Sequence, residues 1–140
     1  MDSDVPDSSI AIGNYNIFRM DRANGTGGGL LCYIRNIYSC SVVSCESVIS
    51  MSQSQTEFLV LYVNEFSLVL IIIYHPHWNN SFAHDDAISC IVSLIDFTHI
   101  KFGRKIRHCL LGDFNDLRKY YDTLSSLTML TPIVNFFHQR

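Results

Sequence analysis

A run of six consecutive apolar residues, Leu68 to Ile73, limits the folds open to this chain more than any other segment. Successive side chains of a strand point to opposite faces of the sheet, so an unbroken apolar run must be covered on both faces. The run is also far shorter than the roughly 20 residues that cross a bilayer. We therefore predict a central strand, Ser67 to Tyr74, inside a larger sheet.

The segments around this strand predict the rest of a sheet with helices outside it. Thr56 to Val63 predicts a neighbouring strand, and the breaker Pro76 is followed by a predicted helix from Phe82 to Phe102, which Gly103 ends. The apolar stretch Ile106 to Leu111 predicts the next strand. The apolar residues at helical spacing, which predict the buried face of that helix, are Ile88, Ile91, Val92, Ile95, His99 and Phe102.

The first third of the chain predicts a hairpin. Ile10 to Arg19 is an extended segment, Asp21 to Gly29 a glycine-rich turn, and Leu30 to Ile34 a strand. Ser39 to Val48 is a weaker strand prediction. Near the other end, Leu124, Leu127 and Leu130 suggest a short helix. The order strand, strand, helix, strand predicts an α/β or α+β sheet fold.

Composition narrows the class of protein. The chain has 140 residues, enough for a single domain, and 48% of them are hydrophobic against 16% charged, which excludes a disordered chain. So apolar a composition is expected for a fragment of a larger fold, because its strands keep the apolar faces that neighbouring segments of the larger fold would cover. The net charge of −3 does not indicate nucleic-acid binding, although basic residues cluster locally. The members of these clusters are Arg104, Lys105, Arg107, Arg118 and Lys119.

The cysteines indicate a reducing compartment. The five of them form an odd set without a C-x-x-C pair, which supports neither a disulfide scaffold nor a zinc ribbon. We expect Cys32, Cys90 and Cys109, which lie in apolar runs, to be core residues. The acidic, polar first residues have no signal-peptide pattern, and we expect an intracellular protein without a membrane segment.

The segment Gly112-Asp113-Phe114-Asn115 is the strongest candidate for chemistry. Asp113 and Asn115 lie two apart where a strand leaves the core, so a carboxylate and an amide face the same way if the backbone stays extended. The alternative is a turn in which both side chains cap backbone groups. Tyr74 ends the neighbouring strand, and a helical crossover between parallel strands brings both strand ends to one edge of the sheet. We therefore predict a site of Tyr74, Asp113 and Asn115.

Other motifs are weaker. The tract Gly25 to Gly29 lacks the Gly-Lys-Ser/Thr of a phosphate loop and predicts a tight turn instead. His75 and His77 flank a proline and would suit a metal, but no third ligand has a readable spacing. The sequence His84-Asp85-Asp86 is interpreted as a solvated helix start.

Three blocks carry a resemblance to a known family. They are Gly13-Asn14-Tyr15-Asn16-Ile17-Phe18-Arg19 with Asp21-Arg22 and Gly27-Gly28-Gly29-Leu30, then Ile73-Tyr74-His75-Pro76, and finally Leu110-Leu111-Gly112-Asp113-Phe114-Asn115. In this order they resemble the endonuclease/exonuclease/phosphatase superfamily, the deoxyribonuclease-I-like fold. Within it the chain is most similar to the endonuclease domain of non-LTR retrotransposons, and the resemblance covers nearly its whole length.

The resemblance implies a four-layered α/β/β/α sandwich and hydrolysis of a phosphodiester assisted by Mg²⁺ or Mn²⁺. Asp113 would orient or deprotonate the attacking water, or bind the metal. Asn115 would hold the attacking group and a phosphate oxygen, and Tyr74 would contact the phosphate as its charge grows. DNA is the implied partner, a reverse transcriptase domain on the same polyprotein a further one, and the nucleus a location the resemblance would allow.

The chain also departs from the family pattern. The family's metal-binding glutamate precedes the glycine hairpin, whereas Glu46, Glu57 and Glu65 follow it, and His138 lacks the aspartate of the family's late Ser-Asp-His block. Residues 1–140 are therefore expected to form one partial domain without the N-terminal and C-terminal catalytic blocks, with little or no nuclease activity. Two alternatives remain open: a non-catalytic module that binds nucleic acid or protein, and a phosphatase branch of the same fold.

Overall fold

The computed structural model describes residues 5–22, 29–50, 55–77, 81–115 and 117. Its strands are β1 (Tyr15–Met20), β2 (Leu30–Arg35), β3 (Cys40–Val42), β4 (Glu57–Val63), β5 (Leu68–Tyr74) and β6 (Arg107–Asp113). Its helices are α1 (Asp7–Ile10), α2 (Glu46–Ile49), the short 3₁₀ helix η1 (Asn64–Phe66) and α3 (Ser81–Phe102). The predicted helix at Leu124, Leu127 and Leu130 lies outside the described residues.

Four strands form one mixed sheet in the order β3-β4-β5-β6. The pairs β3–β4 and β4–β5 are antiparallel, and β5–β6 is parallel because α3 carries the chain back to the starting edge between them. Strand β5 therefore has a neighbour on each side, as its apolar run predicts. The predicted crossover and the α+β class are confirmed.

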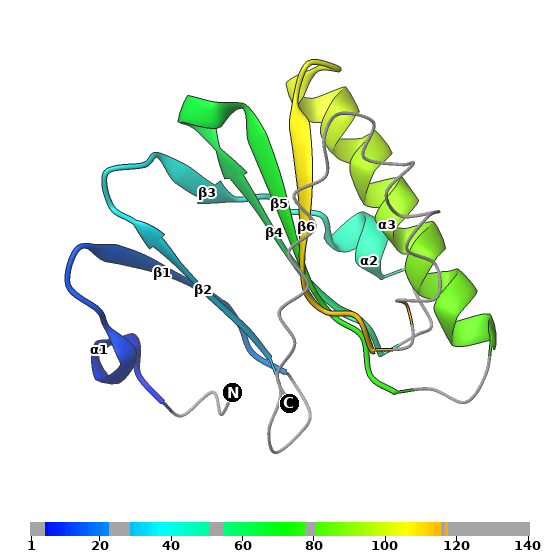
Figure 1. Ribbon diagram of the computed structural model, residues 1–140, viewed down its shortest axis with the longest axis horizontal. Coiled ribbons are helices and arrows are strands. Elements are labelled where there is room, and N and C mark those ends of the chain that lie inside the picture. The colour runs from blue at the N-terminus through cyan, green and yellow to red at the C-terminus, as the bar shows by residue number, and fades with distance from the viewer. Residues whose placement is uncertain (1–4, 23–28, 51–54, 78–80, 116, 118–140) are drawn as a thin grey trace.

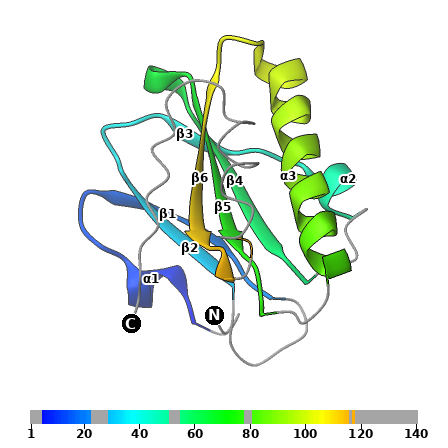
Figure 2. The same cartoon turned by 45° about the vertical axis from the view of Figure 1, so that its right-hand side comes forward.

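The part of the chain that the structure describes has three main layers. Figure 1 shows the β1–β2 hairpin on one side of the four-stranded sheet and the helices α2 and α3 on the other. Turning the view shows α3 running along the strands of the sheet (Figure 2). Strands β1 and β2 pair antiparallel from Tyr15 opposite Arg35 to Met20 opposite Leu30, which confirms the predicted hairpin.

The helix-facing core lies between the sheet and α3. Alternate residues of β5, including Ile71 and Ile73, enter it fully buried, and α3 contributes Ile91 and Leu94. All sixteen members are Val43, Cys45, Phe58, Val60, Val69, Ile71, Ile73, Ala87, Cys90, Ile91, Leu94, Ile95, Ile106, Leu110, Phe114 and Leu117. Their burial is the main source of stability on this face.

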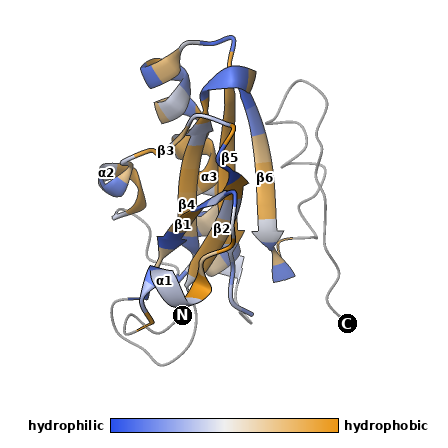
Figure 3. Ribbon diagram, turned by 90° about the vertical axis from the view of Figure 1, so that its left-hand side faces the viewer, coloured by the Kyte–Doolittle hydropathy of each residue, from blue (hydrophilic) through white to orange (hydrophobic). Residues whose placement is uncertain are grey.

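The hairpin-facing core lies between the sheet and β1–β2 and is smaller. Its buried members are Leu30, Leu59, Leu61, Val63, Leu70 and Ile72. Ten partly buried residues surround them, among them Tyr74, Cys109 and Leu111 near the end of the sheet. Figure 3 shows the strands hydrophobic along their middle, while β6 starts hydrophilic and ends pale at its arrowhead.

Some local predictions are wrong. The weak strand predicted over residues 39–48 is a three-residue strand, β3, followed by the helical turn α2. The extended segment predicted from Ile10 begins only at Tyr15, because α1 precedes it. On α3, Ile91 and Ile95 are buried as predicted, whereas Ile88, Val92, His99 and Phe102 are only partly buried. Residues outside the predicted face complete its buried surface: Ala83, His84, Ala87, Cys90, Leu94 and Thr98.

The remaining predictions about class concern membranes and cysteines. Within the described residues, no helix is long and apolar enough to span a membrane. None of the five cysteines, all of which are described, forms a disulfide. Cys90 is buried as predicted, whereas Cys32 and Cys109 are half-buried on the hairpin side of the sheet.

Candidate active site at the end of strands β5 and β6

The last residues of β5 and β6 lie side by side. The parallel register places Tyr74 opposite Asp113, and the backbone N–H of His75 donates to the carbonyl oxygen of Asp113 at 2.9 Å. Side chains alternate between the two faces along a strand. Ile72 and Leu111, two residues earlier on their strands, belong to the hairpin-facing core, so the side chains of Tyr74 and Asp113 lie on that face as well. The predicted proximity of Tyr74 and Asp113 is thus found at one edge of the sheet.

Gly112 allows β6 to approach β5 closely just before the site. Its φ is +131°, and a Cβ added to it would lie 1.9 Å from the carbonyl oxygen of Ile73. Only glycine meets both requirements, because any other residue would clash with the neighbouring backbone. The glycine of the motif therefore has a structural role: it fixes how Asp113 leaves the strand.

Asn115 is fastened to the same edge. Its backbone N–H donates to Oδ1 of Asp113 at 3.1 Å, and its side-chain Nδ2 donates to the carbonyl oxygen of His75 at 2.6 Å. Its φ of +41° is in the left-handed region, which asparagine tolerates better than most residues. The capping alternative is therefore present in the structure, and it also brings Asn115 beside Tyr74 and Asp113.

The three predicted residues differ in exposure in a way that suits a site at an edge. Asp113 is exposed, whereas Tyr74 and Asn115 are half-buried. Oδ1 of Asp113 accepts from the Asn115 backbone, and the residue as a whole is exposed to solvent. The arrangement offers a carboxylate oxygen, an amide and a phenol to one bound group.

A second cluster, which the sequence did not predict, lies on the other side of Tyr74. The antiparallel register puts Glu57, the first residue of β4, opposite Tyr74. Its carboxylate accepts a hydrogen bond from Nε of Arg22 and another from the backbone N–H of Gly29 at 3.1 Å. The guanidinium carbon of Arg22 lies 5.8 Å from the centroid of the Tyr74 ring. Glu57 thus fixes both ends of the segment that joins β1 to β2.

Charge within this cluster is balanced by pairing. The hydrogen bond and charge of Glu57 raise the pKa of Arg22 above its ordinary value, so the guanidinium is always protonated. The Glu57 side chain is 11% exposed and that of Arg22 36%. A partly exposed cation therefore lies against the Tyr74 ring, held by a more deeply buried carboxylate.

Beneath the site, on the helix face, lies a buried polar chain. His75 is fully buried, with Nδ1 2.8 Å from the Thr56 hydroxyl and Nε2 3.0 Å from Nδ1 of His84. The interpretation of His84 as part of a solvated helix start is wrong: it is 7% exposed and joins α3 to the loop after β5. The burial of a polar ring is tolerated here because its nitrogens are hydrogen-bonded. This chain fixes the backbone carbonyl that holds Asn115.

The side-chain oxygens at this edge suit Mg²⁺ in type, but they would bind it only weakly. Hard oxygens such as Asp113 Oδ2 and the amide oxygen of Asn115 are of the type that Mg²⁺ prefers. However, both oxygens of Glu57 already accept hydrogen bonds, so the carboxylate left for an ion is that of Asp113. Over residues 5–22, 29–50, 55–77, 81–115 and 117, no three His, Cys, Asp or Glu side chains lie close enough to form a metal centre. His75, which together with His77 would suit a metal on sequence grounds, is instead buried and hydrogen-bonded to Thr56 and His84.

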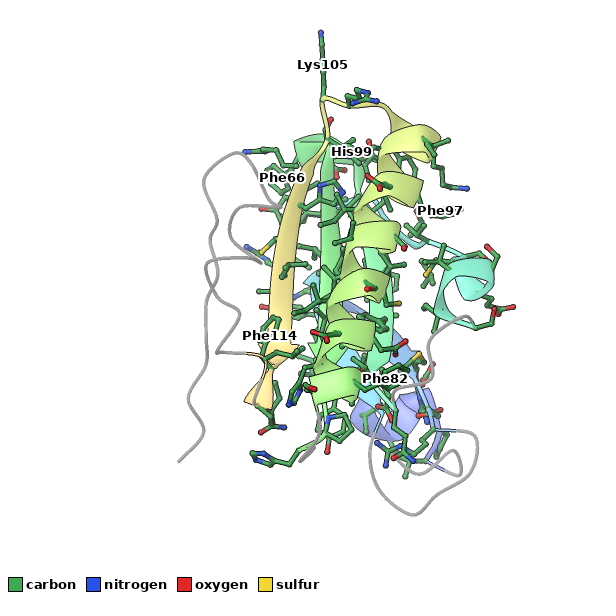
Figure 4. The ribbon with its side chains drawn as sticks, turned by 90° about the vertical axis from the view of Figure 1, so that its right-hand side faces the viewer. Phe66, Phe82, Phe97, His99, Lys105 and Phe114 are labelled. Atoms are coloured by element: carbon green, nitrogen blue, oxygen red, sulfur yellow. The ribbon has the colours of Figure 1, made fainter. Side chains whose placement is uncertain are left out.

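The local basic cluster lies away from the site. Arg104, Lys105 and Arg107 come just before or at the first residue of β6, whereas Asp113 is its last. Figure 4 shows Lys105 at one end of the molecule and Phe114 near the other. Arg118 and Lys119 lie outside the described residues. Arg22, by contrast, contacts one of the predicted residues, with its guanidinium carbon 5.8 Å from the centroid of the Tyr74 ring.

Comparison with known proteins gives no match, whether with protein-family models, with curated proteins or with solved structures. The functional proposal below therefore depends on the geometry of this edge and on the sequence blocks that form it.

Proposed function

We propose that the edge formed by β5 and β6 binds a phosphodiester and that the chain is a divalent-cation-dependent phosphodiesterase domain acting on DNA. The observation that supports this proposal is the parallel register that pairs Tyr74 with Asp113, with Asn115 bonded to the carboxylate of Asp113 and to the backbone carbonyl of His75. The phenol of Tyr74 and the carboxylate of Asp113 come from two adjacent strands, and the amide of Asn115 comes from the turn that follows β6. The type of enzyme is that of the endonuclease domains of non-LTR retrotransposons, in which a reverse transcriptase would be carried on the same polyprotein.

Each of the three side chains has a role that its position supports. The exposed carboxylate of Asp113 accepts a proton from an attacking water or orients it. Asn115, fixed through Nδ2, keeps its amide oxygen and second N–H for the water and for a phosphate oxygen. The Tyr74 hydroxyl donates to the phosphate as negative charge develops there. A bound Mg²⁺ would add Lewis-acid stabilisation of that charge.

The layer order supports the four-layered sandwich as the finer fold assignment. Tyr33 donates through its hydroxyl to the carbonyl oxygen of Ile10, and Arg19 bonds Asp7, so α1 lies against the outer face of the hairpin. Helix, hairpin, sheet and helix therefore follow one another across the molecule (Figure 1). This is the order of layers in the family that the sequence resembles.

Turnover by this chain is expected to be slow. A divalent ion held by one carboxylate keeps most of its waters and binds weakly. Groups that act as a catalytic unit are strongly non-additive, so a site with one acidic ligand loses most of the rate. The proposal therefore predicts Mg²⁺-dependent binding of DNA more strongly than it predicts cleavage.

Binding and cleavage are to be measured together. We expect Mg²⁺ to shift the backbone amide signals of residues 112–115 in NMR spectra and to strengthen the binding of a short DNA duplex. Asp113→Asn should abolish both effects. Asp96→Asn is the matched control, because Asp96 is an exposed aspartate on α3 and undergoes the same chemical change.

Two results would contradict the proposal. One is a Mg²⁺ response that leaves residues 112–115 unchanged, and the other is DNA binding that is equal in wild type and Asp113→Asn. Plasmid nicking with Mg²⁺ decides the catalytic part. Rapid nicking that Asp113→Ala abolishes would show that the site is complete, against the slow turnover predicted here, whereas binding without nicking would favour the non-catalytic module.

A further inference from the structure

Arg22 is held in a fixed position beside the proposed phosphate site. Its Nε donates to Glu57, which is 11% exposed on its side chain, and its guanidinium carbon lies 5.8 Å from the centre of the Tyr74 ring. The same carboxylate accepts a hydrogen bond from the backbone N–H of Gly29, just before β2. The group that anchors the cation is therefore itself held by the hairpin. An anchored arginine loses less side-chain entropy on binding a ligand than a free one.

The guanidinium of Arg22 has N–H groups that its bond to Glu57 does not use. An arginine carries five N–H donors, of which the bond to Glu57 uses the one on Nε. Within the described part of the chain, the Nη groups of Arg22 have no hydrogen bond to a carboxylate or carbonyl; the Tyr74 hydroxyl is a further partner of the guanidinium, and the side chain is 36% exposed. The planar N–H groups of arginine match the geometry of phosphate oxygens.

The register sets how far Glu57, the ion-pair partner of Arg22, lies from Asp113. Glu57, Tyr74 and Asp113 are opposite one another on three adjacent strands, each about 4.8 Å from the next. Arg22 lies on the Glu57 side of Tyr74, and the predicted carboxylate and amide lie on the other side. The separation between the Glu57 side and the Asp113 side of Tyr74 is of the order of the distance between neighbouring phosphates in a nucleic-acid strand.

We propose that Arg22 contacts a second phosphate, next to the one held at Tyr74, Asp113 and Asn115, and that the site therefore selects a nucleic-acid chain over a phosphomonoester. This inference rests on the proposed function. It names the substrate class, because a ligand with a single phosphate can occupy one position only. Arg22 does not act on the reacting phosphate in this scheme; it positions the strand.

The test is the salt dependence of binding. Equilibrium binding of a fluorescein-labelled single-stranded oligodeoxynucleotide is measured at fixed Mg²⁺ over a series of KCl concentrations. Each phosphate contact contributes about 0.7 to the slope of log K against log salt for a single strand. We expect Arg22→Gln to lower that slope by about this amount and to weaken binding several-fold. The affinity for a nucleoside monophosphate should stay unchanged.

Two further variants separate a phosphate contact from a structural effect. Arg35→Gln removes the same charge from an exposed arginine at the far end of the hairpin and should leave the slope unchanged. Arg22→Lys keeps the charge and should keep the slope while losing part of the affinity, because an ammonium lacks the planar fork. Thermal unfolding of each variant checks the fold, and Arg22→Lys carries the test if Arg22→Gln unfolds.

The outcomes distinguish the two proposals. An unchanged slope in Arg22→Gln, or an equal fall in Arg35→Gln, overturns the role of Arg22 alone. Oligonucleotide binding that Asp113→Asn leaves intact overturns the proposed function alone. An oligonucleotide that does not bind the wild-type chain overturns both. Equal weakening of oligonucleotide and monophosphate binding by Arg22→Gln also rejects the second phosphate position.

Discussion

The two faces of the four-stranded sheet are packed to different degrees. Among the described residues, sixteen are buried in the helix-facing core, whereas six are buried in the hairpin-facing core and ten more there are only partly buried. A 22-residue helix covers the first face and a two-stranded hairpin the second. Water therefore reaches the hairpin side near the ends of the strands, and the candidate site lies on that side.

The difference separates the more deeply buried face of the sheet from the face that carries the candidate site. On the helix face, polar groups are paired, as with the buried Thr56 and His75 or the buried Thr98 and the half-buried His108. On the hairpin face, Glu57, Tyr74 and Asp113 form a polar row across three strands and keep contact with solvent. A charged substrate can be bound only where the cost of removing water is small, so the thinner core is the one suited to binding.

The largest effect on this arrangement is expected from Gly112→Ala. The added Cβ would lie 1.9 Å from the carbonyl oxygen of Ile73, at a φ of +131°. Overpacking and backbone strain together are expected to cost about 3–5 kcal/mol, measured by urea unfolding. Both faces of β6 would lose their alignment with β5.

Gly13→Ala is the control for this substitution. A Cβ at Gly13 meets nothing within 4 Å, so we expect a change within about 0.5 kcal/mol. If Gly112→Ala is as stable as Gly13→Ala, the close approach of β6 to β5 does not exist in solution.

Ile71→Ala and Ile72→Ala compare the two cores directly. The residues are neighbours on β5, so strand propensity and backbone pairing are alike, but Ile71 is 0% exposed towards α3 and Ile72 8% exposed towards the hairpin. We expect losses of about 4 and about 2 kcal/mol respectively in the free energy of unfolding. Urea unfolding measures both, and equal losses would mean that the hairpin covers the sheet as tightly as α3 does.

The elements of the main sheet were predictable because their patterns are long and consistent. The predicted strand Thr56 to Val63 and helix Phe82 to Phe102 each differ from the structure by one residue. The short helix α2 was not predictable, since four residues carry too little periodicity to separate a helical turn from a strand. The buried face of α3 was predicted only in part, because apolar residues such as Ile100, which is 86% exposed, occur around the helix.

The site was predictable where topology determines it. The crossover requires the ends of β5 and β6 to meet, which brings Tyr74 and Asp113 together. The pair Arg22–Glu57 depends instead on how the hairpin lies on the sheet, which no local pattern states. The position of Glu57 opposite Tyr74 follows from the register of the hairpin. The turn at Asn64–Phe66 pairs Val63 with Leu68, and counting back along both strands pairs Glu57 with Tyr74.

Acidification should weaken the helix face through His108. Burial, and then the charge of His99, lower the pKa of His108 from 6.5 to about 4. The Thr98 hydroxyl donates to the carbonyl of Leu94 and lies 2.7 Å from Nε2 of the His108 ring. The unfolded chain takes up the proton first as the pH falls. Stability is therefore full above about 6.5 and declines towards pH 4, by about 1–2 kcal/mol after allowance for the water-accessible part of the ring.

His108→Gln tests this assignment, because an amide can keep the bond to Thr98 but does not titrate. Its free energy of unfolding should vary less than that of wild type between pH 6.5 and 4. Chemical unfolding at several pH values measures the difference. A variant that keeps the full pH dependence would assign it to other groups.

The smallest expected effect is a difference in the rate at which the cysteines on the two faces of the sheet are alkylated. Cys45 and Cys90 lie in the helix-facing core, where burial raises their thiol pKa to about 11 and about 12. Cys40 and Cys109 are half-buried on the hairpin face, and burial raises the pKa there as well. Since alkylation requires an accessible thiolate, iodoacetamide should modify Cys40 and Cys109 first. Cys32, with a pKa raised to about 11, should follow, and Cys90 should react last.

Peptide mass spectrometry over a time course gives the order of modification, and the same reaction in denaturant gives the control, in which all five thiols should react at similar rates. Protection relative to that control measures how often each face opens. If Cys90 were modified as fast as Cys109, α3 would be leaving the sheet as readily as the hairpin does. The division between a closed, stabilising face and an open, binding one would then not hold, because Tyr74 and Asp113 would lie on a sheet that is equally accessible from both sides.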